Sequence, residues 1–411
     1  MANEIITGID IGSHSIYTIV ARKKEDLLPQ IIGVGFARSY GVRNGVIVDI
    51  EEAQASIAES IRMAERGAGV KITNAVVSIG GSHISAFPSK GVIAISRADG
   101  EISPDDVDRV INAAQTFSLP HNQEILHVIP REYIVDGEGG IKDPVGMKGV
   151  RLETNALIVS GAASYIKNLH RTLEEVGVGA DGVVLDALAS SKAVLSKRQK
   201  ELGVVCVDIG GGTTGVTVYE EGDLLKTSII PIGGSHITND IAIGLRIPVD
   251  VAENIKFEYG TAETSEVGKR DVIDLASISD QESGTISRKE VCEIMEARLS
   301  EIFDLTNKEL KKIGKEAFLP GGVVLVGGGA KIPHIVDLAK RKMRLTVQIG
   351  FPKEVEGIVE RVDDPAYAAS LGLIFWGMEE RGNAKEGFTP SIPSLNNSVK
   401  QFKKWFRAFL P

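Results

Sequence analysis

One short motif occurs twice in the chain and constrains its fold more than any other feature. Gly-Ile-Asp-Ile-Gly-Ser-His-Ser occupies residues 8–15, and Val-Asp-Ile-Gly-Gly-Gly-Thr-Thr-Gly occupies residues 207–215. Each copy joins two apolar segments through Asp-Ile-Gly and small or hydroxylated residues, which is typical of a β-hairpin whose turn wraps a phosphate. Glycine removes the Cβ that would keep an anion away, and consecutive backbone N–H groups then form an anion nest. The repetition predicts two related halves that face one nucleotide.

An aspartate closes the first strand of each hairpin, beside the expected phosphate. These residues are Asp10 and Asp208. A carboxylate is tolerated there only when a divalent cation or its water shell lies between the two anions. We therefore expect the two aspartates to hold hydrated Mg²⁺ near the β- and γ-phosphates.

Composition sets broad limits on function. A chain of 411 residues exceeds one hydrophobic core, so two or more subdomains are expected. The net charge of −9 argues against the body of the protein binding nucleic acid or an anionic membrane by bulk attraction. Cys206 and Cys292 lie in apolar patterns and form no disulfide framework, which fits a reducing cytoplasm. Because no apolar run reaches transmembrane length and the start lacks a basic signal region, we expect a soluble or at most peripheral protein.

The order of apolar patterns predicts an α/β fold with an insertion. Residues 1–83 alternate between strand and helix patterns. The pattern then changes to alternating segments around one helix, which Ser103 caps and Pro104 opens. We interpret residues 84–162 as an inserted β-rich subdomain.

A third glycine turn, at residues 327–329, follows a four-residue apolar strand and precedes a helix. Alone it is weak evidence, because such turns often serve only close packing. With both hairpins in order and Asp186 between them, however, the chain resembles the actin/Hsp70/sugar-kinase superfamily. The five signature segments of that superfamily match residues 8–15, 186–195, 207–215, 326–335 and 364–375.

The resemblance implies an actin-like duplicated fold whose two halves enclose a cleft for ATP and Mg²⁺. The residues expected to cradle phosphate are Gly12, Ser13, Ser15, Gly210, Gly211, Gly212, Thr213 and Thr214. The residues matching the ribose and base segments are Glu253, Lys256, Gly260, Gly327, Gly328 and Gly329. For Glu253 and Lys256 the alternative is a solvated helix face. None of the histidines has the spacing of a metal site, and His14 and His83 are expected to be loop residues.

Catalysis is expected to be weak at most. Asp186 occupies the position where relatives carry a residue that orients the attacking water, so it could act as a weak general base or simply cap the following helix. Asp186 and Asp208 are the candidate catalytic residues. We expect nucleotide binding to be mainly structural or regulatory.

Residues 398–411 form a pattern that separates apolar and cationic side chains. At 100° per residue one face would carry Val399, Phe402, Trp405, Phe406, Phe409 and Leu410. The flank and opposite face would carry Lys400, Lys403, Lys404 and Arg407. This arrangement is typical of a helix lying in the membrane plane, and the alternative is a helix docked on the protein's own core.

The actin-like body, the insert and the basic tail together resemble the family of the bacterial cell division protein FtsA. The resemblance implies ATP binding, head-to-tail polymerisation with other copies, and tethering of the tubulin-like protein FtsZ to the cytoplasmic face of an anionic membrane at the division site. It also implies that the insert, called subdomain 1C, binds other division proteins. The alternatives are a pilus-assembly actin homologue and a small-molecule kinase of the same superfamily.

The family's arrangement also implies subdomain bounds and a site for the acidic C-terminal tail of FtsZ. The expected parts are 1A (1–83 and 163–195, with a return at 355–378), 1C (84–162), 2A (196–230 and 305–354), 2B (231–304), a flexible linker (379–397) and a membrane-binding helix (398–411). The candidates for the FtsZ tail, on 2B, are Arg298, Arg288 and Lys289, with ordinary surface charge as the alternative.

Overall fold

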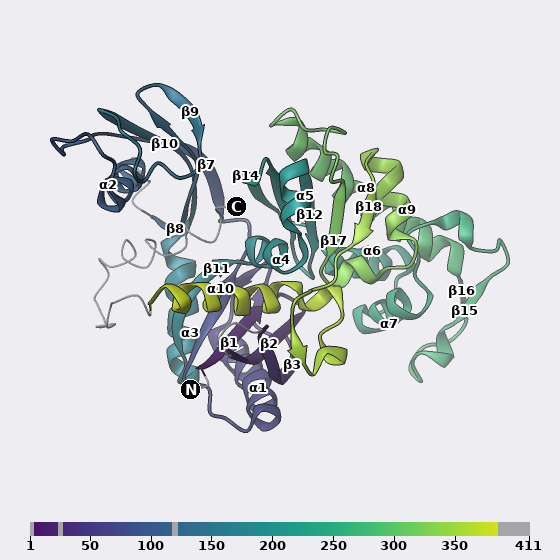
Figure 1. Cartoon of the computed structure of the whole chain (residues 1–411). Coiled ribbons are helices and arrows are strands. Elements are labelled where there is room, and N and C mark those ends of the chain that lie inside the picture. The colour runs from purple at the N-terminus through teal and green to yellow at the C-terminus, as the bar shows by residue number, and fades with distance from the viewer. Residues whose placement is uncertain (1–3, 24–27, 117–121, 385–411) are drawn as a thin grey trace.

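The computed structural model describes residues 4–23, 28–116 and 122–384 of the chain. Two β-sheets with flanking helices form two halves, and a smaller sheet projects from the first half (Figure 1). This arrangement confirms the α/β class. Among the described residues, no helix combines the length and apolarity needed to cross a membrane.

The first half is built on a six-stranded sheet with the order β11-β6-β1-β2-β3-β19. Its first two strands form the expected hairpin, antiparallel from Glu4 opposite Lys23 to Ile11 opposite Ile16. Its strands are β1 (Glu4–Ile11), β2 (Ser15–Lys23), β3 (Gln30–Arg38), β6 (Asn74–Ile79), β11 (Gly179–Leu185) and β19 (Glu356–Gly357). A small hairpin, β4 (Val42–Arg43) and β5 (Val46–Ile47), follows β3.

Alternation along β1 decides which face of this sheet bears the functional groups. Ile9 packs in a core with α1 (Ile50–Ala68) and α3 (Ala163–Val176), whereas Ile6 packs in a second core with α4 (Asp186–Val194) and α10 (Ala368–Ala384). Asp10 lies four residues after Ile6 in the same strand, so both side chains point to the same face of the sheet. That face is covered by α4 and α10, and the second half lies on the same side.

The second half repeats the first. Its sheet has the order β14-β13-β12-β17-β18, and an antiparallel hairpin is again followed by a parallel neighbour. The strands are β12 (Val204–Ile209), β13 (Thr214–Glu220), β14 (Asp223–Ile230), β17 (Val323–Val326) and β18 (Val347–Ile349). The other elements are α5 (Lys197–Leu202), α6 (Gly234–Leu245), α7 (Val249–Tyr259), β15 (Val272–Asp274), β16 (Thr285–Ser287), α8 (Arg288–Lys311) and α9 (Ile335–Met343), with short 3-10 turns at Thr264–Glu266, Leu275–Ser277 and Val359–Arg361.

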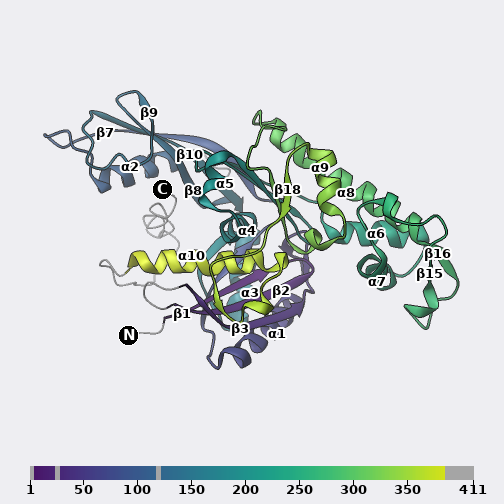
Figure 2. The same ribbon diagram turned by 45° about the vertical axis from the view of Figure 1, so that its right-hand side comes forward.

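The insert forms a separate four-stranded sheet with the order β7-β10-β8-β9 and one helix, as expected. Its elements are β7 (Ser85–Ala94), α2 (Pro104–Gln115), β8 (Gln123–Val135), β9 (Glu138–Ile141) and β10 (Arg151–Ala162). Ser103 caps α2 and forms a capping box with Asp106. The insert has its own hydrophobic core and lies on the side of the molecule away from β15 and β16 in both views (Figure 2).

Two helices join the halves, and they cross at close range. Both views place α10 between the first sheet and α4 (Figures 1 and 2). A Cβ added to Gly372 of α10 would lie 1.8 Å from the carbonyl oxygen of Ala189 in α4. The core around this crossing includes Leu188 and Leu371 together with Val324 of the second sheet, so α4 and α10 pack against both halves.

The end of α10 corrects one expectation. The helix continues to Ala384, beyond Met378, so the first residues of the predicted linker at 379–397 are helical. The rest of that linker and the predicted membrane helix at 398–411 lie outside the described residues.

The helix crossing predicts a stability difference between two glycine substitutions. Gly372→Ala places a methyl group against backbone, so we expect it to lower the free energy of unfolding by about 1–3 kcal/mol. Gly67→Ala in α1 is the control, since its Cβ would lie in ordinary contact, 3.5 Å from the Cα of Gly33 in β3. It removes a helical glycine and should be neutral or stabilising by up to about 1 kcal/mol. Urea unfolding measures both, and equal stability of the two variants would contradict the close crossing.

Candidate nucleotide site

A cavity of about 360 Å³ lies between the two halves, where the two hairpins meet. Most of the residues singled out in the sequence line it. These are Asp10, Gly12, Ser13, Ser15, Asp208, Gly210, Gly211, Glu253, Lys256, Gly327, Gly328 and Gly329. Five others do not: Asp186, Gly212, Thr213, Thr214 and Gly260.

The hairpin turns have matching geometry. Gly12 N–H donates to the carbonyl of Ser15 at 3.1 Å, and Gly210 N–H donates to the carbonyl of Thr213 at 2.9 Å. The turns also face one another, because a Cβ added to Gly211 would lie 2.7 Å from the Cβ of His14. Glycine is therefore needed in the second turn for the first turn to approach it.

The hydroxyl groups of the turns divide into two kinds. Ser13 and Ser15 line the cavity, and the Ser13 Oγ accepts a hydrogen bond from Gly45 N–H at 2.8 Å. Thr214 is fully buried and donates to the carbonyl of Ile232 at 2.7 Å, so its hydroxyl fastens the second hairpin to the segment before α6. The sequence pattern alone does not distinguish these two uses of a hydroxyl.

Two carboxylates form the polar floor of the cavity. Asp10 accepts a hydrogen bond from the Ser78 hydroxyl at 2.7 Å, and Asp208 accepts one from the Ser190 hydroxyl. Burial raises the pKa of Asp10 to about 7, with a further contribution from Asp208, while the Ser78 hydrogen bond opposes the rise. Burial also raises the pKa of Asp208 to about 6. A nearby cation would reverse these shifts, so the donor set fits a divalent cation and its water shell.

Asp186 lies behind this floor and not on the cavity surface. Its Oδ1 accepts from the N–H of Ala187 at 2.6 Å, and its Oδ2 occupies space that a Cβ on Gly80 would fill, at 2.3 Å. Burial, Asp208 and Asp10 hold the pKa of Asp186 well above its ordinary range. Within the described segments, no three His, Cys, Asp or Glu side chains are arranged to bind a metal directly.

Glu253 and Lys256 of α7 lie on the cavity wall, and their side chains are only 13% and 9% exposed. The solvated-face alternative is therefore wrong. Lys256 Nζ lies 2.6 Å from Glu253 Oε2 and 2.8 Å from the hydroxyl of Thr238. Burial alone would raise the pKa of Glu253, but Lys256 and Thr238 hold it below its ordinary value.

The second oxygen of Glu253 shows that this wall is suited to a hydroxylated ligand. Glu253 Oε1 is buried and has no hydrogen-bond partner among the described residues. The Nδ1 of His14 lies 3.7 Å from this oxygen, across the cleft. A buried acceptor without a donor is costly, and a ribose hydroxyl would satisfy it.

The third glycine turn, at residues 327–329, packs against the Asp208 carboxylate and also lines the cavity. Gly327 has a φ of 81°, and a Cβ there would lie 2.3 Å from Asp208 Oδ1. Its N–H donates to the carbonyl of Pro365 at 2.9 Å, at the start of the 3-10 turn η5 (Pro365–Tyr367). The turn continues into η3 (Gly328–Lys331). Gly260, by contrast, ends α7 against Met295 and serves packing.

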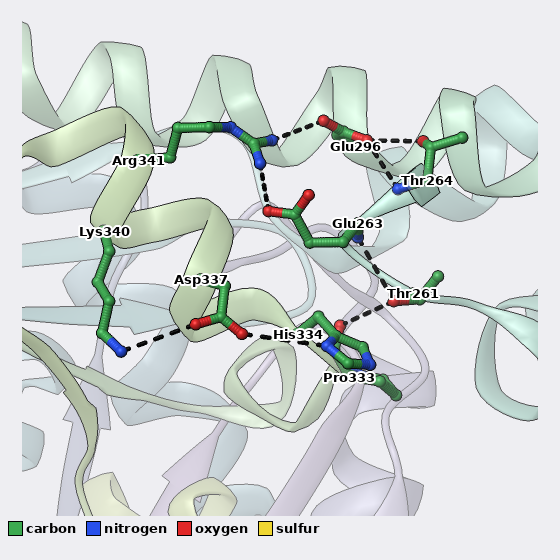
Figure 3. A network of polar contacts seen from close by, with 9 residues as sticks. All are labelled: Thr261, Glu263, Thr264, Glu296, Pro333, His334, Asp337, Lys340 and Arg341. Carbon is green, nitrogen blue, oxygen red and sulfur yellow. Dashed lines mark hydrogen bonds and ion pairs between the residues drawn. The ribbon is translucent and has the colours of Figure 1, made fainter. Parts of the chain in front are cut away.

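A polar network fixes the segment that follows this turn (Figure 3). The carbonyl of Pro333 accepts from Ala262 N–H at 2.9 Å and from the Thr261 hydroxyl at 3.3 Å. Arg341 of α9 pairs with Glu263 and, at 2.7 Å, with Glu296 of α8 (Figure 3). The base side of the cavity is therefore tied to α8 and α9 and held in place before a ligand binds.

Some lining residues were not expected from the sequence. His14 is a loop residue, as predicted, but it also lines the cavity and faces α7. Phe257 lies one helical turn after Glu253, so the i, i+4 spacing was a usable signal. Six further lining residues fall within the signature segments 326–335 and 364–375 but were not named singly: Lys331, Ile332, Pro333, Pro365, Ala366 and Ala369. Tyr17, Gly234 and Ser235 were not predicted.

Comparisons with known proteins identify the family of this fold and site. A family model described as cell division protein FtsA matches residues 205–372, and one described as the SHS2 domain inserted in FtsA matches residues 81–160. Cell division protein FtsA of Pseudomonas aeruginosa is 35% identical over 98% of each chain, and that of Borreliella burgdorferi is 39% identical over 99% of each chain. The chain belongs to the FtsA family.

Solved structures support the actin-like fold of this FtsA-family chain. The PilM–PilN type IV pilus biogenesis complex matches with a TM-score of 0.67 and 13% identity, covering 91% of this chain and 98% of that one. MreB5 of Spiroplasma citri, in a structure bound to AMPPNP, matches with a TM-score of 0.53 and 15% identity, covering 94% and 100%. At these identities the likeness establishes the fold alone.

The basic residues expected to bind the FtsZ tail lie on or next to α8 and already have acidic or carbonyl partners. Arg298 is 25% exposed and pairs with Asp240 at 2.6 Å and Glu301 at 2.5 Å. Arg288 donates to the carbonyl of Tyr259 at 3.0 Å. Lys289 lies 3.4 Å from Glu293 in the same helix.

The raised pKa of Asp10 predicts how stability depends on pH. A carboxyl group whose folded-state pKa is about 7, above the ordinary 3.8, binds its proton more tightly in the folded state, so ionisation destabilises the protein as pH rises through this window. Asp10→Asn should therefore raise the melting temperature of the nucleotide-free protein more at pH 8 than at pH 5. Asp280 is exposed to solvent, so Asp280→Asn is the control variant. A pH-independent effect of Asp10→Asn would show that the pKa is not raised.

Proposed function

We propose that this FtsA-family chain is an ATP-binding, polymerising adaptor that tethers FtsZ to the cytoplasmic face of the membrane during cell division. The observation that carries the proposal is the convergence of two phosphate-type hairpins and a third glycine turn on one cavity between the halves. Several copies in a head-to-tail filament would combine weak membrane contacts into a firm attachment.

The cavity residues supply distinct contacts for ATP. Backbone N–H groups that follow Gly12 and Gly210 in the two turns, including that of Gly211, would bind phosphate oxygens. Asp10 and Asp208 would hold Mg²⁺ through water, and Mg²⁺ would neutralise the phosphate charge. Glu253 would accept hydrogen bonds from the ribose.

The environment of Asp186 supports slow hydrolysis at most. Burial, Asp208 and Asp10 hold the pKa of Asp186 well above its ordinary range, and the side chain does not line the cavity, so Asp186 is poorly placed to act as a general base. This behaviour suits a structural nucleotide with a long bound lifetime.

The C-terminal residues 398–411 supply the membrane contact in this proposal. Their four cations would contribute about 1 kcal/mol each near an anionic leaflet. The aromatic residues of the same segment would add burial in the interface. One such helix is a reversible anchor, so stable attachment depends on the filament.

The FtsZ tail would bind subdomain 2B at Arg298, with Arg288 and Lys289 nearby. An acidic peptide would have to compete with Asp240 and Glu301 for the Arg298 guanidinium. Such exchange of one carboxylate for another favours a weak and reversible contact. Other division proteins would bind the insert.

ATP binding is tested by removing one floor carboxylate. Asp208→Ala should weaken Mg²⁺-dependent ATP binding by about 10- to 100-fold, as loss of a group that orients a metal shell does. Titration with a fluorescent ATP analogue, with and without Mg²⁺, measures the effect. Asp304→Ala, whose carboxylate pairs with Lys342 on the surface, should bind normally. Unchanged affinity of Asp208→Ala would remove this residue from the site.

Tethering is tested by sedimenting FtsZ with anionic liposomes. The full chain should carry FtsZ into the pellet, whereas a chain lacking 398–411 should bind ATP but leave both proteins in the supernatant. Arg298→Glu should pellet by itself and lose FtsZ. Pelleting of the truncated chain would refute the anchor, and retention of FtsZ by Arg298→Glu would refute the assigned FtsZ site.

A further inference from the structure

Helix α4 contacts the nucleotide cavity and the end of α10 through neighbouring residues. Ser190 donates a hydrogen bond to Asp208, which lines the cavity. Two positions later, Lys192 forms an ion pair with Glu379 of α10. Successive helix positions point in different directions, so one short helix contacts both places at once.

The body of α4 cannot absorb a shift at one end by bending. It is nine residues long, and all of its residues from Ala187 to Val194 except Lys192 are classed as buried. Ser191 shares a hydrogen bond of 3.0 Å with Tyr219 inside the second half. Gly372 of α10 packs so closely on Ala189 that the two helices have no free space between them. A displacement of α4 therefore moves α10 or breaks their contacts.

The ion pair between Lys192 and Glu379 is sensitive to a shift of α4. Lys192 and Glu379 side chains are 11% and 30% exposed, so the pair is partly removed from water. Glu379 Oε2 is buried and has no hydrogen-bond partner within the described part of the chain. Burial raises the pKa of Glu379, and Lys192 opposes this rise. Losing Lys192 would leave the buried Glu379 carboxylate without its main partner. The ion pair therefore strongly affects the stability of this end of α10.

Glu379 lies five residues before Ala384, the last described residue of α10. The cationic segment 398–411 follows later in the sequence. We propose that α4 couples ligand occupancy at Asp208 to the end of α10, and so regulates how the C-terminal segment meets the membrane. The inference rests on the proposed function and adds a regulatory path to it.

The coupling follows from competition for the Asp208 carboxylate. In the ligand-free protein this carboxylate accepts from Ser190. The water ligands of a hydrated cation at the cavity floor would donate stronger, charge-assisted hydrogen bonds to the same carboxylate. Ser190 then changes its partner or its position, and α4 transmits the change to Lys192 and Glu379.

The test compares Lys192→Met with a matched control in the full chain. Lys226→Met is the control, because Lys226 pairs with Glu309 of α8 at 2.8 Å, instead of with a residue of α10, and both of those side chains are 17% exposed. Two readouts are taken with and without Mg-ATP: binding to anionic liposomes, and hydrogen exchange of the last two turns of α10. The second readout does not depend on the membrane.

In the unmodified chain and in Lys226→Met, we expect Mg-ATP to change both readouts by about fivefold or more, the lower end of coupling between two sites. Lys192→Met should bind the fluorescent ATP analogue normally and lose the Mg-ATP effect on both readouts. Lys192→Glu should lose it as well, and adding Glu379→Lys should restore it. This rescue separates a specific pair from general destabilisation.

Coupling retained in Lys192→Met, or absent from the unmodified chain, would overturn the inference. Failure of every variant to pellet would refute the membrane role, while hydrogen exchange would still decide the coupling. Failure to bind ATP would refute the proposed function and the inference together.

Discussion

The structure depends on two carboxylates that face one cavity from opposite halves. Asp10 and Asp208 are held there by hydroxyl donors, Ser78 and Ser190, that lie outside the hairpins. Burial and mutual repulsion raise the pKa of Asp10, so an empty cavity is electrostatically unfavourable for the ionised protein. A bound cation would relieve this repulsion. Each half supplies only one side of the cavity.

Glycine is needed wherever the halves or their connections approach closely. Gly211 admits His14 of the opposite turn, Gly327 leaves room for Asp208, and Gly372 lets α10 cross α4. These three glycines belong to different signature segments, yet at each of them a Cβ would block a close approach between two parts of the chain. The glycines thus place the carboxylates as much as they expose the backbone to phosphate.

The sequence predicted the parts that depend on local patterns. The hairpins and the capped helix of the insert follow from short-range spacing and are confirmed. Contacts between segments that are distant in the sequence could not be predicted from such local patterns. Thr214 turns to Ile232 and Asp186 lies behind the cavity because of neighbours brought in by the fold.

The most direct measurement is an experimental structure of the full chain with Mg²⁺ and a non-hydrolysable ATP analogue. The account predicts one nucleotide per chain, with its β- and γ-phosphates between residues 12–15 and 210–211. The ribose should lie against Glu253, and the metal water shell should contact both Asp10 and Asp208. Phosphates bound by one hairpin only, or a nucleotide outside this cavity, would contradict it.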